Sequence, residues 1–225
     1  MRVAVTGICA AGKTTFADEL AAALRPFARP LHRCQLDDFH SVGHKWRSAR
    51  DEYTPRTYYD EGYDYVAFRR LVLDPLAPGG SRRCQFAYFS SYHDEFLPEA
   101  WTGVEPDAIV VVDGGMLLRP DLVDSWDFII WLDIDSETCV ARARQRDVTW
   151  VGDADVVERR YRVRNLPMHA LYIEETGGPA RASVVIDNRD PARPVVGQAS
   201  RGLIRSVSRR LRGRLDGRSF MAHPD

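Results

Sequence analysis

The residues best suited to chemistry stand near the start of the chain, where glycines, a lysine and a threonine occur at a fixed spacing. Four residues separate Gly7 from Gly12, and Lys13 and Thr14 follow directly. Glycines let consecutive backbone N–H groups turn inward toward phosphate oxygens, and the N-terminus of a following helix adds a partial positive charge. Lys13 would reach the β- and γ-phosphates, and the Thr14 hydroxyl would ligate magnesium. The pattern predicts a loop that binds nucleotide phosphates.

The neighbourhood of this loop supports that interpretation. The apolar run 3–6 comes directly before it, and an amphipathic stretch with Phe16, Leu20 and Leu24 follows it. A strand ahead of the loop and a helix behind it distinguish a true phosphate loop from a chance match. The residues that we expect to hold ATP are Gly7, Ile8, Cys9, Ala10, Ala11, Gly12, Lys13, Thr14 and Thr15.

An aspartate at the end of a second apolar run offers a partner for a metal ion. Residues 109–112 are isoleucine and three valines, and Asp113 follows them ahead of two glycines. In phosphate-loop proteins a carboxylate at the end of a neighbouring strand holds magnesium or its water shell. We therefore predict Thr14 and Asp113 as the residues that bind Mg²⁺. The plainer alternative is an aspartate that only caps a strand before a turn.

Phosphate transfer to an alcohol also needs a group that takes the proton from the accepting hydroxyl. The run Asp37-Asp38-Phe39-His40 follows the predicted strand 33–36. Because parallel sheets bind ligands at the carboxyl ends of their strands, a carboxylate there can face the terminal phosphate of ATP. Asp37 is the predicted base, and His40 is a predicted substrate contact. The alternative is that the aspartates only open a turn or cap the next helix.

Short apolar runs alternate with longer helical patterns along the chain, which indicates an α/β fold built on a parallel sheet. Helices are predicted to begin at Lys13, near Asp64, at Ser136 with that serine as N-cap, and near Asp155. The tyrosine-rich stretch 37–64 shows neither periodicity and is predicted to be a long functional loop. The predicted strands are residues 3–6, 33–36, 85–89, 109–112, 128–133 and 183–186.

With these features in this order, the chain resembles the uridine kinase and phosphoribulokinase-like branch of the P-loop kinases from Val3 to about Asn188. Asp37 falls on the catalytic base of that family, and Asp113-Gly114 takes the place of its Glu-Gly. The other matching segments are Tyr59-Asp60, Tyr63-Asp64, Tyr88, His93 and Arg146-Asp147. The resemblance implies a P-loop NTPase fold, with a five-stranded parallel sheet flanked by helices and a small lid.

The same resemblance implies roles for individual side chains. Asp37, Lys13 and Arg146 would be catalytic. ATP and Mg²⁺ would be the cofactors, and the acceptor would be a small molecule with a ribose-like hydroxyl. The residues that would contact this acceptor are Asp37, His40, Tyr59, Asp60, Tyr88, His93 and Arg160.

Two departures from the family pattern concern the lid and the acceptor. Val151-Gly152-Asp153 stands where the family lid carries Arg-Gly-Arg, and Arg160 stands where nucleoside kinases have a glutamine. Arginine favours phosphate and carboxylate groups, because its guanidinium binds them through two parallel hydrogen bonds. Arg47, Arg50 and Arg56 in the acceptor stretch point the same way, whereas the tyrosines there could stack on a flat base.

Three functions therefore stay open from the sequence. The first is a kinase that phosphorylates a nucleoside, uridine or cytidine. The second is a kinase of a sugar phosphate or of a pantothenate-like acid. The third is a non-catalytic regulatory module that binds ATP and transfers nothing. Turnover that depends on Asp37 would separate the two kinases from the module.

Length and composition set the remaining expectations. We predict one kinase domain over residues 1–190, with a lid at about 147–160, and an arginine-rich tail or helix over 191–225. A net charge of −1 gives no global reason to expect nucleic-acid binding, and no apolar run reaches the length of a membrane span. The four scattered cysteines and a strand-like start favour reduced thiols and the cytoplasm. Self-association stays open.

Overall fold

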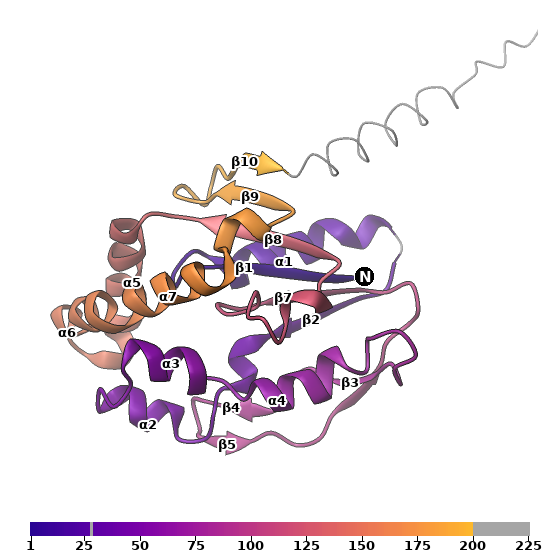
Figure 1. Ribbon diagram of the computed structural model, residues 1–225, viewed down its shortest axis with the longest axis horizontal. Helices are drawn as coiled ribbons and strands as arrows, with labels where there is room; N and C mark the ends of the chain where they lie inside the picture. Colours follow the sequence, from indigo (N-terminus) through magenta and orange to yellow (C-terminus); the bar gives the residue numbers. More distant parts are fainter. Residues whose placement is uncertain (28, 200–225) are drawn as a thin grey trace, which may run out of the picture.

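The computed structural model describes residues 1–27 and 29–199, so most of the predicted arginine-rich tail or helix at 191–225 lies outside the described residues. A central sheet of six strands organises the fold (Figure 1). Its strands are β1 (Arg2–Gly7), β2 (Leu31–Gln35), β7 (Ile109–Asp113), β8 (Phe128–Asp133), β9 (Val184–Asp187) and β10 (Val195–Ala199). They lie side by side in the order β10-β9-β8-β1-β7-β2.

Five of these strands run parallel, as predicted, and β10 is added antiparallel beside β9. All five residues of β7 are buried, which is typical of a strand covered on both faces. In Figure 1, β1 starts at the N-terminus on the right, so the carboxyl ends of the parallel strands lie toward α5 and α6 on the left. Gly7 and Asp113 therefore end neighbouring strands at one edge of the sheet.

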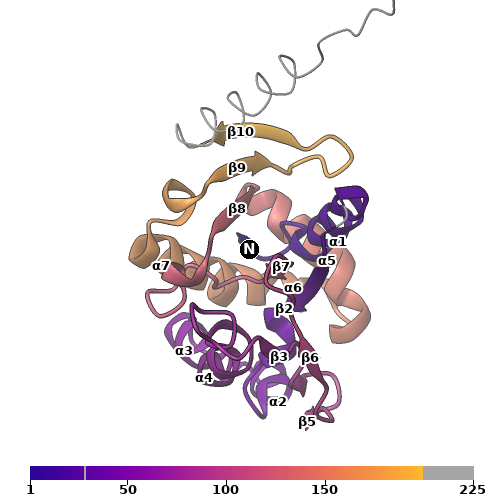
Figure 2. The same cartoon turned by 90° about the vertical axis from the view of Figure 1, so that its right-hand side faces the viewer.

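Helices cover both faces of this sheet. Figure 2 shows α1 and α5 on one side of it and α7 with α3 on the other. The helices are α1 (Lys13–Leu24), α2 (His44–Ala49), α3 (Pro55–Glu61), α4 (Tyr65–Phe68), α5 (Ser136–Val151), α6 (Ala154–Arg160) and α7 (Leu166–Thr176). A 3₁₀ turn, η2 (Leu36–Phe39), follows β2, and a π-helical turn, η5 (Tyr161–Asn165), joins α6 to α7.

Stretch 37–64 is a set of short helices rather than the predicted long loop. It contains η2, α2 and α3. The two α-helices are six and seven residues long, which is too short to show a clear helical period. The start of α3 did carry a signal. Thr54 forms a capping box with Thr57 ahead of Pro55, a combination that favours a helix start.

Two other predictions need correction, and a third was incomplete. The N-cap of α5 is Asp135 and not Ser136, because the Asp135 carboxylate accepts a hydrogen bond of 2.7 Å from the Thr138 amide. The predicted strand 85–89 lies outside the main sheet. Its ends belong to two small two-stranded antiparallel sheets, formed by β3 (Arg83–Gln85) with β6 (Trp101–Gly103) and by β4 (Phe89–Ser90) with β5 (Glu95–Phe96). The helix predicted to begin near Asp155 was given no end, and it continues from α6 through η5 into α7.

The predicted lid region straddles a corner between two helices. Gly152, in a left-handed conformation with φ of 81°, ends α5, and the Asp153 side chain caps the start of α6. Within residues 1–27 and 29–199, no helix is both long and apolar enough to cross a lipid bilayer.

Candidate active site

The phosphate loop connects the end of β1 to the start of α1 through two glycines that no other residue could replace without strain. Gly7 has φ of 148°, and a Cβ there would collide with the Leu132 carbonyl oxygen of β8. Gly12 has φ of 85°, where a Cβ would lie 3.0 Å from the Asn188 amide nitrogen. Both values lie in the left-handed region that glycine tolerates. The loop therefore begins in close contact with the backbone of β8 and then continues into α1.

Contacts from neighbouring elements hold the loop in this shape. The Lys13 ammonium donates a hydrogen bond of 2.8 Å to the Ile8 carbonyl across the loop. The Asn188 side chain, just after β9, donates to the Ala11 carbonyl at 2.7 Å, and Arg142 of α5 donates to the Ala10 carbonyl at 3.2 Å. The backbone that would receive phosphate is therefore supported from outside by two elements.

The two residues predicted to bind magnesium lie together. The Thr14 hydroxyl donates to Asp113 Oδ2 at 2.6 Å, and Arg33 of β2 donates to Asp113 Oδ1 at 2.7 Å. Arg33 fixes the orientation of this carboxylate, which is only 4% exposed. Hydroxyl and carboxylate oxygens are the donors that Mg²⁺ prefers, and it commonly takes only one or two of them from a protein. This donor set fits the ion.

Asp38, which the sequence did not single out, belongs to the same cluster of carboxylates. Burial, together with the charges of Asp37 and Asp113, raises the pKa of Asp38 to about 6. A divalent cation among these carboxylates would offset their mutual repulsion, which is a second reason that the site suits Mg²⁺. The doubled aspartate after β2 was the available sequence signal.

Asp38→Asn is expected to stabilise the magnesium-free protein at pH 8 by about 2–4 °C in Tm. The folded-state pKa of Asp38 lies above its ordinary value of 3.8. Stability is therefore lost as the pH rises from about 4 to about 6, and the whole cost is present above that range. Asparagine removes this cost, so the difference in Tm should vanish near pH 4. Thermal unfolding at both pH values tests this, and an equal Tm at pH 8 would contradict it.

The predicted base lies exposed in η2, at the end of β2. The Tyr63 hydroxyl donates to Asp37 Oδ1 at 3.0 Å, and the His40 ring donates from Nδ1 to the Asp37 carbonyl at 2.7 Å. The rings of His40 and Tyr63 stack with centroids 4.4 Å apart. One stacked pair thus holds both the backbone and the carboxylate of Asp37.

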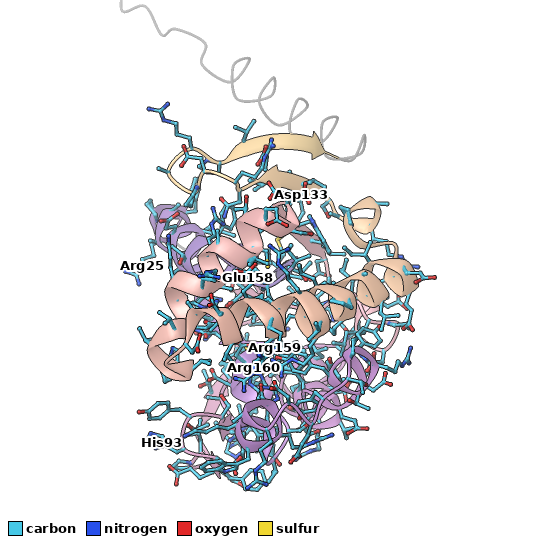
Figure 3. All side chains as sticks on the ribbon, turned by 90° about the vertical axis from the view of Figure 1, so that its left-hand side faces the viewer. Arg25, His93, Asp133, Glu158, Arg159 and Arg160 are labelled. Atoms are coloured by element: carbon cyan, nitrogen blue, oxygen red, sulfur yellow. The ribbon has the colours of Figure 1, made fainter. Side chains whose placement is uncertain are left out.

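The remaining predicted acceptor contacts are spread more widely. Tyr88 stacks on Phe39 and donates its amide to the Asp38 carbonyl, so it lies beside the carboxylate cluster. His93 is exposed near the tip of the β4–β5 hairpin, at the edge of the molecule in Figure 3. Its ring contacts that of Tyr92.

Tyr59 and Asp60 are not brought to Asp37. Tyr59 is 2% exposed in the core, where the Arg119 guanidinium lies 4.6 Å from its ring. Asp60 forms an ion pair of 2.7 Å with Arg56 on the same helix. Tyr58, the residue before Tyr59 on α3, faces the predicted acceptor side instead. The Tyr58 ring stacks there with the ring of His44.

The two predicted arginines join different elements: Arg146 links α5 to η5, and Arg160 links α6 to the end of α2. Arg146 bonds to Asp147 at 2.6 Å and to the Tyr161 hydroxyl at 2.9 Å. Arg160 donates to Asp51 at 2.6 Å and to the Ala49 carbonyl at 2.7 Å, and Figure 3 shows it on the side of α6 that faces the acceptor helices. The charge of Arg160 is thus already paired.

Sequence reasoning missed a contact from α7 to the phosphate loop. The Cys9 amide donates to His169 Nε2 at 2.8 Å. Burial and the nearby Lys13 ammonium lower the pKa of His169 to about 3, so its ring is neutral and Nε2 is free to accept. Because the helix predicted near Asp155 had no predicted end or direction, nothing in the sequence placed this histidine at the loop.

Comparison with known proteins agrees with this architecture. Residues 3–188 match the model of the phosphoribulokinase/uridine kinase family. No curated protein matches the chain. Among solved structures, a possible uridine kinase from Bacillus stearothermophilus is 17% identical, with 82% of this chain and 87% of that chain covered and a TM-score of 0.63.

Two further structures are similar to the chain. A putative fructose transport system kinase from a Silicibacter species is 26% identical, with 78% of this chain and 85% of that chain covered and a TM-score of 0.61. A D-glycerate 3-kinase from Cryptococcus neoformans is 13% identical, with 88% and 89% covered and a TM-score of 0.57. The likeness to the Bacillus and Cryptococcus structures, at 17% and 13% identity, shows a shared fold only.

Proposed function

The chain belongs to the phosphoribulokinase/uridine kinase family of P-loop kinases, and on that premise we propose that it transfers the γ-phosphate of ATP to a hydroxyl of a small, ribose-like acceptor. The observation that carries the proposal is the position of the Asp37 carboxylate. It lies exposed at the same edge of the sheet as the phosphate loop and Asp113, and Tyr63 orients it.

The residues of the loop would bind and orient ATP. Backbone N–H groups between Gly7 and Thr14 would receive the phosphate oxygens, and Lys13 would leave the Ile8 carbonyl for the β- and γ-phosphates. Thr14 and Asp113 would hold Mg²⁺, which neutralises charge on the phosphates when bound. Arg146 would add positive charge from the lid side.

Asp37 would accept the proton of the attacking hydroxyl. The oxygen of that hydroxyl forms a bond to the γ-phosphorus while the bond from the γ-phosphorus to the bridging oxygen breaks, and ADP leaves. Tyr63 and His40 restrict the rotation and position of Asp37, so that less ordering is needed when the acceptor arrives.

A nucleoside, uridine or cytidine, is one candidate acceptor. The stacked rings of His40 and Tyr63 beside Asp37 favour it, because a flat base binds well against such rings. An acceptor with its own phosphate or carboxylate is the second candidate, and a buried arginine described below favours that one. A regulatory module without transfer is the remaining alternative.

Release of ADP in the presence of magnesium and ATP tests the proposal. The acceptors to add are nucleosides, pentose phosphates, D-glycerate and pantothenate, one at a time. We expect one group of acceptors to raise ADP release well above the rate with ATP alone, with phosphate recovered on the acceptor. Binding of ATP without stimulation by any acceptor would support the regulatory module instead.

A further inference from the structure

Arg164, in the π-helical turn η5, is the one buried arginine within the part of the chain that the structure describes, at 7% exposure. Its hydrogen bonds all go to neutral groups. Nε donates to Asn165 Oδ1 at 3.0 Å, and Nη1 donates to Ser48 Oγ at 3.1 Å and to the Ser48 carbonyl at 3.4 Å. Among the described residues, no carboxylate lies within ion-pair distance of it.

Several other arginines nearby in the sequence are different. Arg144 and Arg146 of α5, Arg160 of α6 and Arg162 of η5 each form an ion pair with an aspartate or a glutamate. A buried charge without a counter-charge is costly, because burial removes its hydration and nothing replaces it. Arg164 therefore carries a positive charge that the described protein groups do not balance.

Two more polar atoms without partners lie in the same place. The Tyr53 hydroxyl and His44 Nδ1 are buried, and neither finds a hydrogen-bond partner among the residues that the structure describes. The rings of His44, Tyr53 and Tyr58 lie within 5.2–5.5 Å of one another, and the Arg164 guanidinium lies 5.1 Å from the Tyr58 ring. Buried polar groups are normally satisfied, so two unsatisfied polar atoms beside a guanidinium that lacks a counter-charge indicate a ligand.

This cluster lies close to both the predicted base and the phosphate loop. The His44 ring lies 4.0 Å from the His40 ring, which holds the backbone of Asp37. On the other side, the Asn165 amide contacts the Cys9 sulfur in the phosphate loop at 3.7 Å. The cluster thus borders the place where the acceptor hydroxyl must meet the γ-phosphate.

We propose that Arg164, together with the Tyr53 hydroxyl and the His44 ring, binds a phosphate or carboxylate group that the acceptor itself carries. The inference rests on the proposed kinase function and narrows it to anionic acceptors. The arginines that the sequence suggested for this task are already paired, Arg47 with Glu61 and Arg160 with Asp51. A guanidinium binds such an anion through two parallel hydrogen bonds, which suits a site of this kind.

Matched pairs of acceptors test the charge directly. Ribose is compared with ribose 5-phosphate, glycerol with D-glycerate, and panthenol with pantothenate, in wild type and Arg164→Gln. We expect the charged member of the active pair to be preferred by wild type, and Arg164→Gln to raise its KM by about 10- to 100-fold with a smaller change in kcat. Arg164→Lys should recover part of this loss. The control is Arg162→Gln, because Arg162 in the wild type is already paired with Glu137 and Glu158.

Thermal unfolding separates binding from a structural role. Because Arg164 has no counter-charge, Arg164→Gln should unfold at the same temperature as wild type or higher when no anion is added. With Mg²⁺ and a non-hydrolysable ATP analogue occupying the phosphate loop, inorganic phosphate should raise the Tm of wild type relative to chloride at equal ionic strength. The same addition should leave the Tm of Arg164→Gln unchanged.

The outcomes distinguish this inference from the proposed function. Equal KM values for charged and neutral acceptors, or a lower Tm of Arg164→Gln without anion, would overturn the anion site and leave the kinase standing. If no acceptor stimulates ADP release, the kinase proposal fails. In that case the phosphate-dependent Tm shift alone decides whether Arg164 binds an anion.

Discussion

Asp37→Asn is expected to lower kcat by about 10²- to 10⁴-fold while the affinity for ATP stays unchanged. The amide has almost the same shape as the carboxylate and can still accept the hydrogen bond from Tyr63, but it cannot take up the proton of the acceptor hydroxyl. Steady-state ADP release with the best acceptor gives kcat. Titration with a fluorescent ATP analogue gives the nucleotide affinity.

A matched substitution provides the control for this result. Asp124 is exposed, and within residues 1–27 and 29–199 its carboxylate takes part in no hydrogen bond or ion pair, so Asp124→Asn should behave as wild type. A kcat of Asp37→Asn within a few-fold of wild type would exclude Asp37 as the base. Loss of ATP binding in the same variant would instead mean that Asp37 supports the loop.

Lys13→Ala is expected to weaken ATP binding and to reduce turnover by about 10²-fold or more. Lys13 stands at the start of α1 and bonds to the Ile8 carbonyl across the loop, so its ammonium lies where the phosphates would bind. Removing it takes away the positive charge that would follow the γ-phosphate during transfer. ATP titration and ADP release measure the two effects separately.

The chain offers a natural control, because Lys45 is its only other lysine. Lys45 is exposed, and its ammonium donates a hydrogen bond of 2.8 Å to the Tyr92 carbonyl in the turn between β4 and β5. Lys45→Ala should bind ATP and turn over as wild type does. If both lysine variants lose ATP binding equally, the loop assignment is in error.

The sequence predicted the sheet well because its strands are continuous apolar runs. Residues 109–112 and 129–132 are apolar runs that suit the middle of a covered sheet, and all of them are buried there. Short helices were harder to predict. The six residues of α2 complete fewer than two turns, so their pattern cannot be told from that of a loop.

For the site, the sequence predicted the residues at strand ends better than those on helices. The meeting of Thr14 with Asp113 follows from strand order and could be predicted. Whether Tyr58 or Tyr59 faces the acceptor depends on the rotation of α3, which the packing of its other face on α7 determines. Arg164 could not be told from its neighbours, because its lack of a carboxylate partner is a property of three-dimensional packing.

The contacts between η5, α6 and the end of α2 have a mechanical consequence. Arg160 is bound to Ala49 and Asp51, and Arg164 is bound to Ser48, so two arginines of one helical segment grip the last turn of another. Separating α2 from this segment would break the Arg160–Asp51 ion pair together with the hydrogen bonds to Ala49 and Ser48. We therefore expect the end of α2 to move together with α6 and η5, so that a ligand bound against one of them restricts the other.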